Sequence, residues 1–198
     1  MLLAGVACIL VWSLIGCHDV FTWFMEVLPV LIAVPVLIRL YPRLPFTNLV
    51  YWLIAIHATI LMVGGHYTYA MMPVFDWIKE WFHLSRNYYD RLGHFAQGFV
   101  PALIAREVLL RVTPLKKGGM LTTLVMGLCM GISAMYELVE FAAAKLTGSA
   151  ADAFLGSQGD PWDTQWDMTF CLIGASCALL FFSRIHDRAL ARLGKATA

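Results

Sequence analysis

The chain has 198 residues, of which 60% are hydrophobic and 14% are charged, whereas a soluble domain of this size carries about 25% charged residues. So much apolar surface cannot be buried within a small globule. This excludes an ordinary soluble protein and makes a lipid bilayer the expected surrounding. The net charge of +1 gives no sign of a nucleic-acid partner. The 5 cysteines have the spacing of neither a disulfide framework nor a zinc site, so we interpret them as small residues in helix packing.

The hydropathy pattern predicts an all-α fold, a polytopic membrane helical bundle that forms a single integral membrane domain over residues 1–198. Pro73–Phe82 is short and amphipathic, and it predicts an interfacial helix over the outer surface. About six runs are apolar enough to be transmembrane helices. They are Leu2–Gly16, Val27–Tyr41, Leu49–Gly65, Leu92–Val112, Met120–Leu146 and Trp166–Phe182.

The first two spans are short for the ~20 residues that a bilayer core requires. They can extend into Cys17–Glu26, whose aromatic residues suit a membrane interface. Leu14–Cys17 has the form of a lipoprotein cleavage box, but no basic residue precedes it. A signal peptide begins with a basic region, so we expect the first segment to be retained as a span. Pro29 and Pro35 lie inside the second span and predict a kink there.

The basic residues are distributed unevenly between the two sides of the predicted bundle. Ten of the 14 Lys and Arg residues lie at the ends of the second, fourth and sixth spans or directly after them. The positive-inside rule places that side in the cytoplasm, together with both termini. The loops Cys17–Glu26, His66–Tyr89 and Thr147–Asp163 are then expected to face outward.

Ionisable side chains gather at the predicted outer ends of the spans. Asp90, His94 and Gln97 recur at i, i+4 and i+7, so they share one face of a helix. Glu137 and Glu140 share a face of the next span by the same rule. Ionised groups at membrane depth cost at least ~2.5–3.5 kcal/mol each, so they face the interior of a bundle. We therefore expect these stripes to converge.

For the other polar residues near the spans, a structural role is an alternative to a functional one. Asp160 precedes a proline, which favours a helix N-cap, whereas Asp163 and Asp167 share one face of the last span. His57 lies in the middle of its span, which favours a hydrogen bond between helices. His66 closes the same span at the outer side. Glu107 and Arg111 are spaced as an ion pair at the cytoplasmic rim, which favours a structural role.

Long motifs resemble a known family. "YDRLGHFAQGFVPALIAREVLLR", "YELVEF" and "GDPWDTQWDM" resemble the YjdF-like family of bacterial inner-membrane proteins, a domain of unknown function. The resemblance covers nearly the whole chain and implies a multi-span protein of the bacterial inner membrane. The sequence also resembles VanZ-like proteins more weakly. They too place Asp-x-x-x-His on one helix and acids on later helices. Neither resemblance implies an activity.

Carboxylates with a neutral imidazole are suitable ligands for a divalent metal ion, which can lower the pKa of a bound water and create a nucleophile. We therefore predict a metal-dependent hydrolase or transferase that acts on a lipid or lipid-linked head group at the outer leaflet. The predicted catalytic residues are Asp90, His94, Glu137 and Asp167. The predicted metal ligands are Asp90, His94, Glu137, Glu140, Asp163 and Asp167.

Two other classes of function stay open. The acids can form a proton or cation relay in an ion-coupled transporter, or they can fix helix packing in a structural or accessory membrane protein. The mostly apolar cytoplasmic half of the last three spans argues against a relay through the membrane. The number of acids and histidines argues against a purely structural role.

Overall fold

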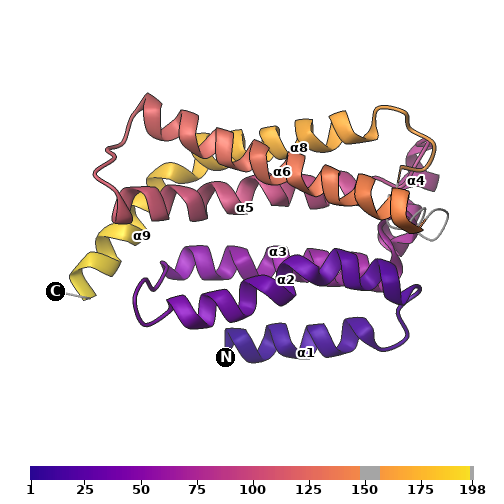
Figure 1. Cartoon of the computed structure of the whole chain (residues 1–198), viewed down its shortest axis with the longest axis horizontal. Coiled ribbons are helices and arrows are strands. Elements are labelled where there is room, and N and C mark those ends of the chain that lie inside the picture. The colour runs from indigo at the N-terminus through magenta and orange to yellow at the C-terminus, as the bar shows by residue number, and fades with distance from the viewer. Residues whose placement is uncertain (148–156, 197–198) are drawn as a thin grey trace.

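The structure is a computed structural model that describes residues 1–147 and 157–196, with side chains up to Gly194. The described residues form helices and connecting segments only, so the predicted all-α class is confirmed (Figure 1). The predicted loop Thr147–Asp163 lies largely outside them. The elements are α1 (Leu2–Leu14), α2 (Val20–Leu40), α3 (Asn48–Tyr67), the 3-10 helix η1 (Tyr69–Met71), α4 (Pro73–Phe82), α5 (Tyr89–Val112), α6 (Gly119–Thr147), α8 (Asp163–Cys177), the π-helical η3 (Ala178–Phe182) and α9 (Ser183–Ala196).

Membrane-spanning length and composition are clear for 4 helices in the described part of the chain: Val20–Leu40, Asn48–Tyr67, Gly119–Thr147 and the continuous run Asp163–Gly194. α1 is apolar but shorter. α5 carries charged residues near both ends, and most of them are buried by its neighbours α3, α6 and α8. The predicted number of about six spans therefore stays a prediction for α1 and α5.

α2 begins a full turn or more before the predicted span, because Asp19 caps it. The Asp19 carboxylate accepts a hydrogen bond from the Thr22 N–H at 2.7 Å, and this bond holds the pKa of Asp19 below its usual value. Such a cap satisfies one of the free N–H groups at a helix start. As a result Glu26, which we expected in an outer loop, lies inside the helix and is buried.

α5 and α8 approach so closely that their backbones touch. A Cβ atom on Gly98 would overlap the Cys171 carbonyl group, and one on Gly174 would overlap the Phe95 carbonyl group. Cys129 of α6 fits against this contact, with its Sγ 3.6 Å from the Gly98 carbonyl oxygen. Small residues permit such approaches between membrane helices. The interpretation of the cysteines as packing residues thus agrees with the structure for Cys129 and Cys171, which are both buried.

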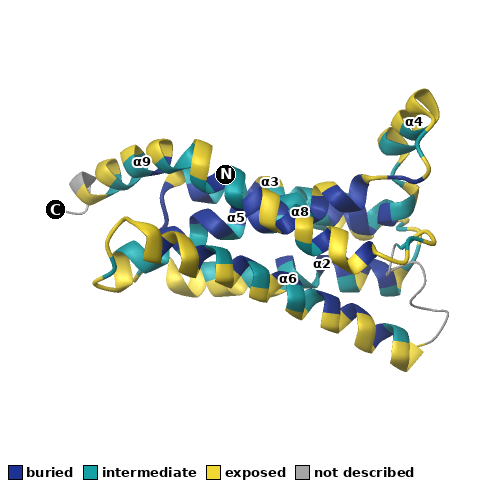
Figure 2. Ribbon diagram, turned by 90° about the horizontal axis from the view of Figure 1, so that it is seen from above, coloured by how far each residue is buried: buried dark blue, intermediate teal, exposed yellow. Residues whose placement is uncertain are grey.

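The buried apolar residues form two main clusters on either side of α3. One cluster joins α1, α2 and α3 around Val27 and Met62, and the other joins α3, α5, α6 and α8 around Leu103 and Val125. Figure 2 shows that α4 extends away from the bundle and is largely exposed, as expected for the predicted interfacial helix. The bundle therefore has an α1–α3 half and an α5–α8 half, and the candidate site lies where the two halves face each other.

Candidate functional site

A buried group of charged residues joins the starts of α5 and α8, and we call it the polar cluster. Each of its side chains is almost fully buried. The members from the α5 side come from one helical turn and the residues just before it, and those from α8 come from its first two turns. The polar cluster consists of Arg86, Asp90, Arg91, His94, Asp163 and Asp167.

Two arginines hold the acids of the polar cluster together. Arg86 and Arg91 both donate to Oδ1 of Asp163, at 2.5 Å and 2.6 Å. Arg91 also donates to Oδ2 of Asp90 at 3.0 Å and to Oδ1 of Asp167. Buried carboxylates with such partners are stabilised in their charged form. Asp163, a predicted metal ligand, is thus the acceptor of two arginine bonds.

His94 lies between the two carboxylates of the polar cluster that are closest to it. Its Nε2 is 3.3 Å from Oδ1 of Asp90 and 3.5 Å from Oδ1 of Asp167. Its Nδ1 is 3.0 Å from Oε1 of Gln97, one turn further along α5. The predicted i, i+4, i+7 stripe on this helix is therefore a continuous chain of contacts.

The group of described residues that could share one metal ion consists of Asp90, His94 and Asp167. One ligand atom of each lies within 4.8 Å of the others. The amide oxygen of Gln97 favours a proton on Nδ1 of His94, so Nε2 is the nitrogen that faces the two carboxylates and that a metal ion would bind. A neutral imidazole beside carboxylates is a suitable donor set for Zn, Mn or Fe.

α6 brings two further acids to the same region. Glu137 and Glu140 are both buried, and each is near enough to His94 for their charges to interact. Neither belongs to the group that lies within metal-sharing distance. One oxygen of Glu137 is buried without a hydrogen-bond partner in the described structure. The structure thus brings α5, α6 and α8 together at this end. Of the six predicted metal ligands, Asp90, His94 and Asp167 lie close enough to share one ion.

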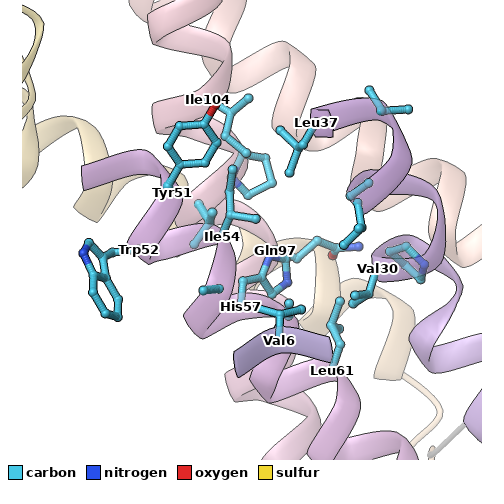
Figure 3. A pocket seen from close by; sticks show the side chains of 18 of the residues that line it. Val6, Val30, Leu37, Tyr51, Trp52, Ile54, His57, Leu61, Gln97 and Ile104 are labelled. Atoms are coloured by element: carbon cyan, nitrogen blue, oxygen red, sulfur yellow. The ribbon is translucent and has the colours of Figure 1, made fainter. Parts of the chain in front are cut away.

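A groove of about 1080 Å³ opens beside the polar cluster. Apolar side chains of α1, α2, α3 and α5 line most of its length, among them Val30, Leu37 and Ile54 (Figure 3). At the end near α4 the lining becomes polar. The polar lining residues at this end are Glu26, Tyr69, Asp90, His94, Gln97, Tyr136 and Glu140.

Several groups of this site were missed from the sequence. Glu26 was assigned to a loop, but it lines the groove and its Oε2 is 3.4 Å from the Tyr136 hydroxyl. Arg86 lies in the loop before α5 as predicted, but its contact with the buried Asp90 was missed. Arg91 was not among the predicted site residues, but it is 4% exposed and lies at the centre of the polar cluster.

The two histidines of α3, His57 and His66, do not belong to the polar cluster. His66 stacks on Trp12 and its Nδ1 is 3.1 Å from the Ser13 carbonyl oxygen, so it fixes α1 against α3. His57 lines the groove deeper in the bundle, and its Nε2 has no hydrogen-bond partner among the described residues. The interhelical hydrogen bond predicted for His57 is therefore not made by this nitrogen.

A second buried network lies at the opposite end of α5 and is structural. Glu107 accepts hydrogen bonds from the N–H and hydroxyl groups of Thr47, each at 2.9 Å, at the start of α3. It also contacts His186 of α9 at 3.0 Å, and the predicted pair with Arg111 is confirmed at 2.8 Å. These bonds connect α3, α5 and α9.

A helical bundle with bilayer-spanning helices and a charged group buried at one end defines an integral membrane protein. The chain matches the family model "Predicted membrane protein (DUF2238)" over residues 1–188. It is 52% identical over 189 residues to "Inner membrane protein YjdF" of Escherichia coli strain K12, covering 96% of this chain and 90% of that protein. The chain therefore belongs to the DUF2238 membrane protein family, and the YjdF-like resemblance is confirmed. No solved structure matches the chain.

Proposed function

We propose that the chain binds a lipid or lipid-linked molecule in the groove and acts on its head group as a hydrolase or transferase. The groove carries this proposal, because it is apolar along most of its length and ends beside His94 and Asp90. An amphiphile has the same division between an apolar chain and a polar end. A volume of about 1080 Å³ exceeds the upper end of the ~300–1,000 Å³ range of small-molecule pockets.

His94 is the residue proposed to move the proton in this reaction. A water or hydroxyl oxygen attacks the head-group ester and gives its proton to Nε2 of His94, and the bond to the leaving oxygen then breaks. The leaving oxygen takes the proton back from His94. Asp90 and Asp167 flank Nε2 and stabilise the protonated imidazole. Gln97 orients the ring through Nδ1.

A divalent metal ion is the proposed cofactor. Asp90, His94 and Asp167 would hold it, since their ligand atoms are close enough to share one ion. Nε2 of His94 would then be a ligand of the ion and not the base. An ion bound there would supply Lewis-acid stabilisation and a more acidic water. Arg91 contacts the same two carboxylates, so the ion would compete with the arginine for them.

We propose an inner-membrane location with the polar cluster at the outer face. The E. coli relative is named an inner membrane protein, which supports the location. Ten of the 14 Lys and Arg residues lie on the side assigned to the cytoplasm. Figure 1 shows the N-terminus and the C-terminus directed toward the same end of the bundle, away from α4, which agrees with this topology.

Transport is the second candidate, and one feature of the groove favours it. The lining extends from Glu26 and Tyr69 at the polar end to Tyr41 and Asn48 at the α2–α3 connection. An amphiphile that moved along the groove would cross most of the bundle. Between these ends the lining is mostly apolar and offers a charged head group few polar partners, His57 among them, so the enzyme is the better account.

A lipid-conversion assay tests the enzyme. The purified chain in mixed micelles is incubated with radiolabelled lipids extracted from its native membrane, and the products are separated by chromatography. The wild type should form a product that His94→Ala does not form. His66→Ala is the matched control, because His66 bonds α1 and lies apart from the polar cluster. Equal amounts of product from the wild type and from His94→Ala would contradict the proposed enzymatic function.

A further inference from the structure

The polar end of the groove is acidic, while the arginines of the polar cluster are directed elsewhere. The groove lining includes Glu26, Asp90 and Glu140 but neither Arg86 nor Arg91. Both arginines instead donate to Asp163, on the α8 side. A molecule in the groove therefore meets carboxylates before it meets any arginine.

Glu26 and Glu140 reach the groove from opposite halves of the bundle. Tyr136 connects them, because it lies one turn before Glu140 on α6 and its hydroxyl donates to Glu26 at 3.4 Å. The two glutamates are near enough for their charges to interact. Two such carboxylates repel each other in a low-dielectric environment. The nearby His94 is shared with Asp90 and Asp167.

The same place contains polar groups without partners. The Tyr69 hydroxyl is buried and lines the groove near Glu26, but it makes no direct hydrogen bond of good geometry to a described residue. Glu140 is 9% exposed, and among the described residues no hydrogen bond or ion pair involves its carboxylate. Buried polar groups in native proteins normally have partners, so these groups indicate a ligand that donates hydrogen bonds.

We propose that the groove selects lipids whose head group carries a protonated amine, with the ammonium group held between Glu26 and Glu140 and the chains in the apolar part. This proposal rests on the lipid groove of the proposed function and adds the class of lipid. An ammonium group has three N–H donors and a positive charge, which match the two carboxylates and the Tyr69 hydroxyl. A head group with only a phosphate would place a negative charge beside Glu26, Glu140 and Asp90.

A pair of lipids that differ only at the amine tests the selection. Short-chain phosphatidylethanolamine and its N-acetyl derivative share the chains and the phosphate, but acetylation removes the positive charge. Both are added to the full-length chain in detergent, with phosphatidylglycerol as a third lipid, and the bound fraction of each is measured by native mass spectrometry. The wild type should prefer phosphatidylethanolamine over both by about tenfold or more, the ratio for one charge-assisted hydrogen bond.

Variants locate the effect. Glu26→Gln and Glu140→Gln should each reduce the preference to less than about threefold, since a neutral amide removes the charge term. Glu137→Gln is the matched control, because Glu137 is a buried glutamate on the same helix that does not line the groove, and it should keep the wild-type preference. Equal binding of the three lipids by the wild type, or a preference for phosphatidylglycerol, would overturn the amine proposal and leave the lipid groove intact. Binding of none of them would overturn both.

Discussion

The hydroxyl of Tyr136 on α6 donates a hydrogen bond to Oε2 of Glu26 on α2 at 3.4 Å. This bond connects the α1–α3 half of the bundle with the α5–α8 half at the polar end of the groove. The two halves otherwise meet mainly through α3 and α5. This polar contact lies at the place where the apolar part of the groove meets its polar end.

The central position of Arg91 predicts a large loss of stability on its removal. Arg91→Met leaves Asp90, Asp163 and Asp167 without one shared donor. Removal of one partner of a buried ion pair costs about 3–5 kcal/mol. The free energy of unfolding, measured by denaturant titration in detergent, should fall by about this amount. Lys145→Met is the control, since Lys145 is exposed and its loss should change stability by less than ~0.5 kcal/mol. Equal effects would show that the polar cluster does not stabilise the fold.

The close contact of α5 and α8 predicts a strong effect of a single methyl group. In Gly98→Ala the new Cβ overlaps the Cys171 carbonyl group, so the helices must move apart. Overpacking of this kind costs about 1–3 kcal/mol. Gly127→Ala on α6 is the matched control, because nothing lies within 4 Å of a Cβ built at that position. The melting temperature should fall for the first variant only, and a fall of the same size in both would contradict the packing seen here.

Some of this architecture could be predicted from the sequence. The bounds of α4 agree with the predicted interfacial helix because its amphipathic pattern and Pro73 mark it clearly. The spacing of Asp90 and His94 predicted their contact within α5, since helical periodicity alone fixes it. Asp167 follows the same rule within α8, but its contact with Arg91 depends on how two distant helices pack, which periodicity does not specify.

The errors have physical causes. Glu26 was placed outside the helix because hydropathy cannot register the Asp19 cap, which starts α2 early. Arg86 lies in a loop as predicted, but its part in the polar cluster was missed because hydropathy does not register that its long side chain reaches the buried acids. Asp160 was expected to cap α8, but it accepts a hydrogen bond from the Trp162 N–H at 2.9 Å, and the helix begins at Asp163. The N-cap of α8 is therefore Trp162, two residues after the predicted Asp160.

Metal binding should depend on the residues that lie close enough to share an ion. Elemental analysis of the purified wild type should find about one divalent ion per chain, from one His and two carboxylates. Excess Mn²⁺ or Zn²⁺ should raise the melting temperature, because a ligand that binds only the folded state stabilises it by about 2.7 kcal/mol at a hundredfold excess over its Kd.

His94→Ala and Asp167→Asn should lose both the ion and this shift in melting temperature, whereas Glu137→Gln should keep them. Protein without metal, whose melting is unchanged by added ions, would exclude the cofactor. His94 would then carry a proton between the two carboxylates.

The proposed orientation predicts where reporter fusions are active. A phosphatase fused after Lys195 should be inactive and a fluorescent protein at the same site should fold, because the C-terminus is expected in the cytoplasm. A phosphatase inserted after Thr147 should be active outside. The opposite pattern would move the polar cluster to the cytoplasmic face.

Occupancy of the groove tests the central claim most directly. Ala33→Trp should fill the groove, because Ala33 is one of its lining residues, whereas Ala142→Trp adds the same side chain to an exposed position of α6. Native mass spectrometry of the purified chains should show bound lipid in the wild type and in Ala142→Trp. Ala33→Trp should retain about tenfold less, as expected if the indole takes the space of the apolar chain. Equal lipid on all three proteins, or none on the wild type, would contradict a lipid-binding groove.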